Sequence, residues 1–377
     1  MTSAAAKRVL GGRERIKVCI AQVSPVYLNR DATVLRAVAT IHEAGANAAD
    51  LVVFPETWLS GYPYWTEGWD SSLREWAAGR IRFFDEALLV PSAATEAIGR
   101  AAREARVHVV MGCNEVDPRP GNGTIYNSLV FFDRTGTIMG RHRKLMPTFI
   151  ERLFWGSGDG NDLEVYDTDI GRIGGLICGE NLMTPLRAAM IGMGEDIHIA
   201  VFPGAFSLDV GPRLQEWDMT GRFWGHFVTR AHALEGGCFV CCASAFVDPN
   251  DVAQDVPHRS SLHMDWARGG SQIVSPLGMP IAGPVEGAQL LYADCHAWMI
   301  KAVKAIVDTL GHYGRPDAVR VQIRKNEQWQ LPGEAYGASR LVRLDAAALE
   351  RAADTYEVAL DRVEEIADAR QMLIAKS

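Results

Sequence analysis

The stretch Ile173-Gly-Gly-Leu-Ile-Cys-Gly-Glu-Asn181 contains the residue that decides how this chain is interpreted. Its apolar run from Ile173 to Ile177 is typical of a buried β-strand, and the pattern becomes helical from Thr184 onward. Cys178 therefore stands where a strand gives way to a turn and a helix. Backbone N–H groups and a helix N-terminus at such a turn would lower the pKa of the thiol and favour the nucleophilic thiolate. The alternative is a buried, unreactive cysteine, because free cysteine is among the most buried residue types.

Two further segments favour a chemical role for this region. Leu51-Val-Val-Phe-Pro-Glu56 is a strand-like run that stops at a proline and is followed at once by a carboxylate. Chemistry in open α/β sheets gathers at the carboxyl ends of strands, so Glu56 lies where a general base would lie. Arg141-His-Arg-Lys-Leu-Met-Pro-Thr148 places Lys144 between basic residues and an apolar patch. The alternatives are a solvated turn glutamate and a solvated basic loop.

The rest of the pattern alternates between strands and helices, which indicates an α/β domain. Helices are expected after the N-caps Asp31 and Ser92, and a longer helix is expected from Leu214 to Leu234. Residues 247–270 are polar and rich in turn formers, so they are predicted to form a loop. The expected strands, including a hairpin across 128–141, are 18–23, 51–54, 107–111, 128–132, 137–141, 173–177, 197–202, 238–246, 271–274, 279–282 and 289–293.

Length and charge narrow the possible classes of protein. The chain has 377 residues, which is enough for one large α/β domain or two small ones. A net charge of −8 and a sequence pI near 5.7 give no electrostatic reason to expect binding to nucleic acid or to an anionic membrane. The sequence shows no apolar run long enough for a transmembrane helix and no secretory signal before Gly12, so we expect a cytoplasmic protein.

The cysteines and histidines indicate neither a disulfide scaffold nor a metal site. The seven cysteines are odd in number and scattered over strand-like runs, which suits reduced thiols in a cytosol. Cys238 and Cys241 form a lone Cys-x-x-Cys in an apolar segment, so we expect core cysteines there and not a zinc site. The ten histidines include no His-x-x-x-His pair, and we expect no metal and no cofactor.

In combination, these segments resemble the nitrilase branch of the carbon–nitrogen hydrolase superfamily. The order Glu56, Lys144, Cys178 is that family's order, and the gaps of 88 residues (144 − 56) and 34 residues (178 − 144) are similar to the family's. The resemblance extends over roughly residues 15 to 320. The longer segments that carry it are 54–65, 142–160, 230–240 and 311–317.

The resemblance implies a four-layer α-β-β-α sandwich for residues 15–325, with an extension at 1–14 and a tail at 326–377. It also implies a homo-oligomer, built from dimers that pair through helical faces and in some nitrilases extended into spirals. In the tail, Asp345 suits the N-cap of a helix with a heptad-like stripe of Leu349, Ala353, Tyr356, Leu360, Val363 and Ala367. This helix either packs on its own domain or docks on another subunit.

The resemblance further implies hydrolysis of a small organic nitrile to a carboxylic acid and ammonia. In that scheme Cys178 is the nucleophile, Glu56 is the general base, and Lys144 stabilises the tetrahedral species together with the Gly179 N–H. Glu151 is similar in position to a second glutamate of the family that positions the lysine or the substrate. The alternative is that Glu151 and Arg152 form a surface Glu–Arg pair. Related activities on amides, carbamoyl amines or cyanide remain alternatives, as does a non-catalytic binding member of the family.

Four residues are candidates for the substrate pocket. Many nitrilases place a tryptophan straight after the nucleophile, whereas this chain has Gly179, which predicts a more open wall beside the reacting carbon. Tyr62, Trp65 and Trp155 are candidate pocket walls, although aromatic residues equally serve as core fillers. The sequence leaves open whether the natural nitrile is aliphatic, aryl or arylaliphatic.

Overall fold

The computed structural model describes residues 8–65, 73–119, 121–205, 223–257 and 259–325, which contain two six-stranded sheets. In the first sheet, β1, β2 and β3 are parallel and the flanking strands are antiparallel. In the second sheet, β7, β8 and β9 are parallel and again have antiparallel neighbours. The first sheet has the order β12 (Gln289–His296), β1 (Arg15–Gln22), β2 (Leu51–Val53), β3 (His108–Val116), β4 (Ile125–Phe132), β5 (Ile138–Arg143). The second has the order β11 (Pro280–Glu286), β10 (Gly269–Val274), β9 (Phe239–Ser244), β8 (Ile197–Phe202), β7 (Gly171–Ile177), β6 (Tyr166–Thr168).

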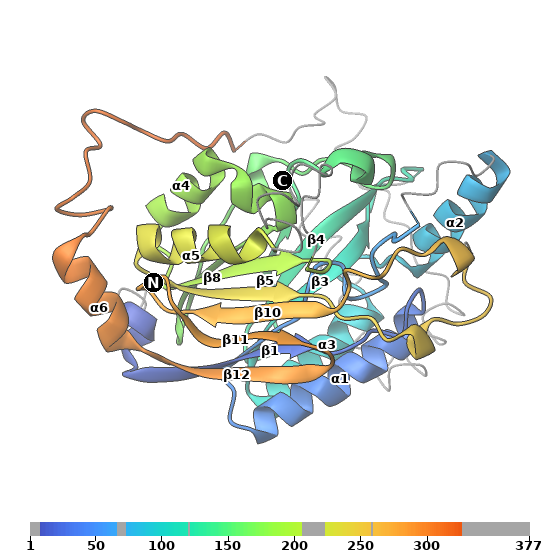
Figure 1. The fold of residues 1–377 in the computed structure, drawn as a ribbon, viewed down its shortest axis with the longest axis horizontal. Helices are drawn as coiled ribbons and strands as arrows, with labels where there is room; N and C mark the ends of the chain where they lie inside the picture. Colours follow the sequence, from blue (N-terminus) through green and yellow to red (C-terminus); the bar gives the residue numbers. More distant parts are fainter. Residues whose placement is uncertain (1–7, 66–72, 120, 206–222, 258, 326–377) are drawn as a thin grey trace, which may run out of the picture.

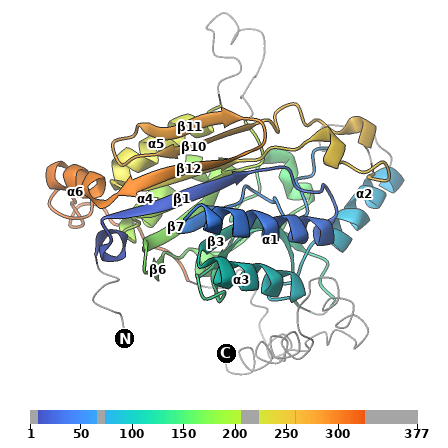
Figure 2. The same ribbon diagram turned by 90° about the horizontal axis from the view of Figure 1, so that it is seen from below.

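Helices cover the outer face of each sheet. Helices α4 (Thr184–Gly192) and α5 (Gly225–Gly236) lie on the second sheet (Figure 1). Helices α1 (Arg30–Ala46) and α3 (Ala93–Ala105) lie side by side on the first sheet (Figure 2). This arrangement confirms the expected four-layer α-β-β-α sandwich. Helices α2 (Leu73–Glu86) and α6 (Ala297–Ile306) lie at opposite ends of the molecule (Figure 1) and were not anticipated from the sequence.

Side-chain alternation explains why the two sheets can pack together. On β1, Val18 and Ile20 point into the core between the sheets, whereas Cys19 and Ala21 point toward α1 and α3. Ile173 and Ile177 of β7 enter the same inter-sheet core from the other side. Successive side chains of a strand point to opposite faces, so a strand that is apolar throughout can be buried on both faces. The apolar runs noted in the sequence are therefore strands covered on both sides.

Most predicted elements are present with shifted ends, but two details were wrong. Helix α1 begins at Arg30 and is capped by Asn29, whose side chain accepts the Ala32 N–H, so Asp31 is a first-turn residue and not the N-cap. The carboxylate of Asp31 still suits the positive end of the helix. Among the described residues, the predicted long helix at 214–234 is shorter and later, because α5 starts at Gly225 and Gly237 ends it in a left-handed conformation. Residues 214–222 lie outside the described residues.

Several other expectations can be placed on the structure. Leu10, in the expected N-terminal extension, is fully buried in the inter-sheet core from the 3-10 turn η1 (Val9–Gly12). The expected loop at 247–270 holds two short 3-10 turns, η6 (Pro249–Asp251) and η7 (Arg259–Ser261), before β10 begins at Gly269. All seven cysteines are buried and free, which confirms Cys238 and Cys241 as core residues. Within the described ranges, none of the helices has the length and apolarity that a membrane crossing requires. The predicted C-terminal helix falls outside the described residues.

Candidate active site

Three chain segments bring Glu56, Lys144 and Cys178 to one buried point. Glu56 follows β2, Lys144 follows β5, and Cys178 follows β7, so the residues come from both sheets of the sandwich. The Lys144 Nζ donates a hydrogen bond to Glu56 Oε1 at 3.0 Å. The Cys178 sulfur and one carboxylate oxygen each from Glu56 and Glu151 lie within 4.8 Å of one another. The structure therefore assembles all four predicted catalytic residues into one cluster.

Glu151 is the second counter-charge of Lys144. The Lys144 Nζ donates to Glu151 Oε2 at 2.7 Å, and the Thr148 N–H donates to the same oxygen at 2.6 Å. The Tyr62 hydroxyl donates to the other oxygen at 3.0 Å. Burial alone would lower the pKa of Lys144, but the Glu151 and Glu56 carboxylates outweigh it and hold that pKa well above its usual value. Lys144 is therefore a fixed cation with two of its three protons engaged.

Glu56 has one engaged oxygen and one free oxygen. Its Oε1 accepts hydrogen bonds from Lys144 and from Asn127 Nδ2, the latter at 2.6 Å. Its Oε2 is buried and receives no hydrogen bond from any described residue. Burial raises the pKa of Glu56 to about 7 against the opposing effect of Lys144. Such a carboxylate is suited to accepting a proton near neutral pH. Asn127 was not found from the sequence, because it lies inside β4 without a distinguishing motif.

Cys178 is held in a strained conformation at the end of β7. Its φ is +49°, in the left-handed region that non-glycine residues rarely adopt, and it opens the 3-10 turn η4 (Cys178–Leu182). The predicted lowering of the Cys178 pKa was wrong. Burial and the Glu56 carboxylate raise that pKa well above its usual value, although Lys144 and the Gly179 N–H act in the opposite direction. A five-residue turn beside two carboxylates does not provide the field of a long helix, so the thiol needs a base.

The turn that carries Cys178 is tied to the segment that carries Lys144. Glu180 accepts hydrogen bonds from His142 Nε2 at 2.8 Å, from the Leu145 N–H at 2.7 Å and from the Ile177 N–H at 2.8 Å. Burial raises the pKa of Glu180, but His142 and the two N–H groups outweigh it and leave the pKa below its usual value. Glu180 is therefore ionised although buried, and its hydrogen bonds join the end of β5 to the end of β7.

Gly179 faces the same segment. A Cβ atom placed on Gly179 would lie 2.7 Å from Thr148 Oγ1. The side chain that the sequence lacks at this position would therefore be directed at Thr148, three residues before Glu151. In this chain, glycine lets the cysteine turn and the lysine segment approach each other closely. The consequence for the wall of the substrate pocket stays a prediction.

Of the three predicted aromatic walls, Tyr62 reaches the charged cluster directly through Glu151. Trp155 packs on Tyr62 with ring centroids 5.4 Å apart and donates its indole N–H to Asn114 at 2.9 Å. Trp65 packs edge-on against Phe83 and Phe154, at 6.0 and 5.6 Å. Tyr62 thus lines the charged cluster and Trp155 packs on Tyr62. Trp65 belongs to the same aromatic cluster and is connected to Trp155 through Phe83.

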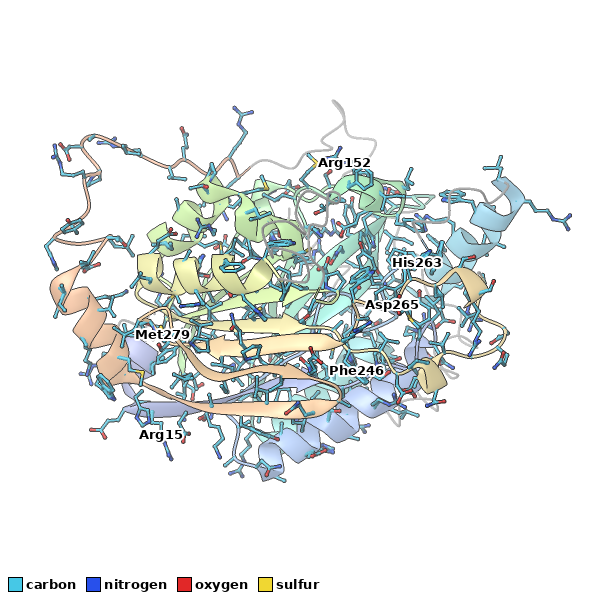
Figure 3. All side chains as sticks on the ribbon, viewed as in Figure 1. Arg15, Arg152, Phe246, His263, Asp265 and Met279 are labelled. Carbon is cyan, nitrogen blue, oxygen red and sulfur yellow. The ribbon has the colours of Figure 1, made fainter. Side chains whose placement is uncertain are left out.

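Two further aromatic residues adjoin Tyr62. Trp266 contacts the ring edges of Tyr62 and Tyr64, at 5.5 and 5.1 Å between centroids. Its segment is held in place by the His263 N–H, which donates to the Tyr64 carbonyl at 3.0 Å. Figure 3 marks this segment by His263 and Asp265, and it marks the segment next to Glu151 by the exposed Arg152. Sequence reasoning missed Trp266 because it lies in a stretch whose composition predicts only a loop.

Comparison with known proteins agrees with this geometry. The family model described as carbon-nitrogen hydrolase matches residues 17–305. The chain therefore belongs to the carbon–nitrogen hydrolase family and is a hydrolase that acts on carbon–nitrogen bonds. Similar curated proteins place it in the nitrilase branch. "Nitrilase 2" of an unknown prokaryotic organism is 35% identical over 322 residues, covering 85% of this chain and 96% of that protein.

Two other relatives and two solved structures show the same likeness. The "Aliphatic nitrilase" of Rhodococcus rhodochrous is 34% identical, covering 82% of this chain and 79% of that protein. The "Bifunctional nitrilase/nitrile hydratase NIT4B" of Nicotiana tabacum is 36% identical, covering 82% and 86%. Saccharomyces cerevisiae Nit3 shares the fold with a TM-score of 0.58 at 23% identity, covering 80% of this chain and 97% of that one. An amidase from Nesterenkonia sp. has a TM-score of 0.53 at 16% identity, covering 77% and 94%.

Proposed function

We propose that the protein hydrolyses an organic nitrile to the carboxylic acid and ammonia through a covalent intermediate on Cys178. The observation that carries this proposal is the unpartnered, buried Glu56 Oε2 in the cluster that also contains the Cys178 sulfur and Lys144. A thiol whose pKa is raised needs a base at hand, and a carboxylate with a pKa of about 7 and a free oxygen provides one.

In the first half of the reaction, Glu56 takes the proton of the Cys178 thiol as the sulfur attacks the nitrile carbon. One carbon–nitrogen π bond breaks, and its electron pair goes to the nitrogen, which receives the proton from Glu56. The product is a thioimidate. Splitting a difficult addition into covalent steps lowers the barrier of each step.

In the second half, Glu56 takes a proton from a water molecule that adds to the thioimidate carbon. Glu56 returns this proton to the nitrogen, which gives a tetrahedral species with a hydroxyl and an amino group. Glu56 then transfers the hydroxyl proton to the amino nitrogen as the carbon–nitrogen bond breaks, so that ammonia leaves and a thioester remains. A second water molecule then attacks the thioester and releases the carboxylic acid and the thiol. The nitrile and two water molecules are thereby converted to one acid and one ammonia.

Lys144, Gly179 and Glu151 support these steps electrostatically. The third proton of Lys144, which neither glutamate engages, is free for the reacting atom of the tetrahedral species. The Gly179 N–H, which already lowers the pKa of Cys178, is a second donor to developing negative charge. Glu151 keeps Lys144 charged and oriented, and it does so through three hydrogen bonds.

Relatives favour a nitrile over an amide as substrate, since the curated proteins named above are nitrilases at 34–36% identity. One of them is named for both nitrilase and nitrile hydratase activity. The tetrahedral species can lose either ammonia or the thiol, and the second route yields an amide. Amide as a partial product is therefore a candidate second activity.

The test is product analysis over matched nitriles and amides of aliphatic, aryl and arylacetonitrile type. We expect ammonia and acid from at least one nitrile class, with slower or no turnover of the corresponding amide. Cys178→Ala should abolish turnover, and Cys241→Ala, which alters an equally buried cysteine on β9, should retain it. Turnover of amides with inert nitriles would replace the proposal with an amidase, and full activity in Cys178→Ala would refute the covalent mechanism.

A further inference from the structure

A second buried cluster of ionisable side chains lies behind the nucleophile, and the mechanism above does not use it. Glu195 lies two residues before β8, His198 lies on β8 and His232 lies on α5, and all three are fully or almost fully buried. Glu195 Oε1 is 2.8 Å from His198 Nδ1, and Glu195 Oε2 is 2.9 Å from His232 Nε2. The two imidazole rings stack with centroids 3.7 Å apart.

Asn181 connects this cluster to the cysteine. Its Nδ2 donates to the Cys178 carbonyl at 3.1 Å and to the Leu176 carbonyl at 3.3 Å. Two carbonyl neighbours require the amide N–H₂ on that side, so the Asn181 Oδ1 is the atom that faces His198 Nε2, at 3.1 Å. An amide oxygen accepts only, and His198 Nε2 must therefore carry a proton.

The same reasoning assigns the remaining protons. His232 Nε2 donates to Glu195, and its Nδ1 is buried with no partner among the described residues, so the ring is neutral. Burial and the neighbouring His198 lower the pKa of His232 to about 4, which agrees with that assignment. Burial raises the pKa of Glu195, but the two histidines outweigh it and bring it to about 2. An ionised carboxylate only accepts, so His198 Nδ1 donates to Glu195 while His198 Nε2 donates to Asn181.

The Cys178 carbonyl oxygen, which ends this series of hydrogen bonds, belongs to a peptide group of the active site. The Cys178 carbonyl and the Gly179 N–H belong to one planar peptide group, so a hydrogen bond to the oxygen also fixes the direction of the N–H. The Gly179 N–H in turn points at the Cys178 sulfur and lowers its pKa. Because the φ of Cys178 is +49°, the surrounding structure has to hold this peptide in place.

We propose that Glu195, His198 and Asn181 form a relay that orients and polarises the Cys178–Gly179 peptide and so strengthens the Gly179 N–H as a donor to negative charge. A charged hydrogen bond polarises the next one in a chain, so the ionised Glu195–His198 pair acts on the N–H through Asn181. The three are positioning residues, since none of them touches the reacting atoms. The inference rests on the proposed function for the role of the Gly179 N–H during attack.

The same side chains also have the donor types of a metal site, since ligand atoms of Glu195, His198 and His232 lie within 4.8 Å of one another. The direct hydrogen bonds favour the relay, because both Glu195 oxygens already accept from an imidazole nitrogen. Metal analysis of the purified protein separates the two possibilities. A stoichiometric divalent ion that is lost in His198→Phe would overturn the relay.

Two variants separate charge from orientation. Glu195→Gln keeps the shape and a hydrogen bond to His198 but removes the negative charge, whereas His198→Phe removes the hydrogen bond to Asn181 altogether. The matched control is Gln272→Leu, which removes a buried amide of the same sheet that bonds to Thr229 and the His226 carbonyl and not to Asn181. Melting temperature and circular dichroism report whether each variant folds.

The main readout is the rate at which iodoacetamide alkylates Cys178 at one fixed pH, located by mass spectrometry, beside kcat and KM. A weaker Gly179 donor leaves less thiolate at a pH below the pKa of the thiol, so labelling slows. We expect a loss of about 5-fold in labelling and kcat for Glu195→Gln and of about 30-fold for His198→Phe, with KM unchanged. Gln272→Leu should lower the melting temperature without slowing the labelling.

The labelling rate does not depend on which substrate the enzyme uses. If no nitrile reacts but the variants slow labelling as expected, the proposed function fails and the relay stands. If both variants label and turn over like the folded wild type, or if Gln272→Leu slows labelling as much as Glu195→Gln does, the relay is refuted.

Discussion

Replacing Lys144 by methionine tests whether the charge of Lys144 is what keeps the buried Glu56 and Glu151 carboxylates stable in the folded protein. Methionine preserves most of the volume but removes the cation that lies 2.7 Å from Glu151 and 3.0 Å from Glu56. Glu56, with a pKa of about 7 in the intact site, takes up a proton at little additional cost. The group that loses most is then Glu151, which keeps the Tyr62 and Thr148 hydrogen bonds but no counter-charge.

The size of the effect is bounded by the cost of protonating one carboxylate. An unfolded glutamate has a pKa of about 4.3, so keeping it neutral at pH 7 costs at most 1.36 × (7 − 4.3), or about 3.7 kcal/mol. At pH 5 the same expression gives about 1 kcal/mol. A carboxyl whose folded pKa is raised destabilises the protein above its unfolded pKa, and the penalty therefore shrinks as the pH falls. Loss of one partner of a buried pair typically costs about 3 to 5 kcal/mol, which is consistent with this bound.

The assay is urea unfolding of wild type, Lys144→Met, Glu151→Gln and the double variant at pH 7 and pH 5, at one protein concentration. We expect Lys144→Met to lose up to about 3.7 kcal/mol at pH 7 and much less at pH 5. The double variant should recover most of the loss at pH 7, because no unpaired carboxylate is left at position 151. Nitrile turnover should stay at least about 10³-fold below wild type in Lys144→Met and in the double variant, because in the proposed mechanism Lys144 also stabilises the transition state.

Three results would each refute a part of this reasoning. A stability loss of equal size at both pH values would show that the cost is one of packing and not of charge. A double variant no more stable than Lys144→Met would show that Glu151 does not depend on the lysine. Recovery of turnover in the double variant would remove Lys144 from the transition state.

Three further outcomes are expected. The acid limb of kcat/KM should have its midpoint near pH 7, because Glu56 must be ionised to accept the thiol proton, and a profile that is flat down to pH 5.5 would exclude Glu56 as the base. The free energy of unfolding should fall by about 3 kcal/mol between pH 6.5 and pH 4, because His232 takes up a proton in the unfolded chain and stays neutral in the folded protein. A urea-unfolding series should show a smaller pH dependence for His232→Gln. Gly179→Ala should lower the melting temperature, because the added Cβ would lie 2.7 Å from Thr148 Oγ1. Adding Thr148→Ala should restore most of the lost melting temperature, and no recovery would show that the clash lies elsewhere.

Glu56 and Cys178 were readable from the sequence because each follows an apolar strand. The runs before Glu56 and Cys178 are buried on both faces of their sheets, so hydrophobicity alone marks where each strand stops. Lys144 and Glu151 were identified from the family resemblance and the spacing. By contrast, Asn127 lies within β4 and Trp266 in a polar segment, and neither position has a local signal of its own.

The sequence by itself determined the fold class, the order of the strands along the chain and the three chemical groups that end them, since these depend on periodicity and on turn residues. Only the tertiary structure decided the protonation of the site. Two sheets pack face to face, and the packing removes water from Cys178, so the pKa of the thiol is raised. In the proposed mechanism the thiol therefore depends on Glu56 as its base. The Glu195–His198–Asn181 chain exists because β8 and the cysteine turn meet in space, and a pKa depends on such neighbours rather than on sequence distance.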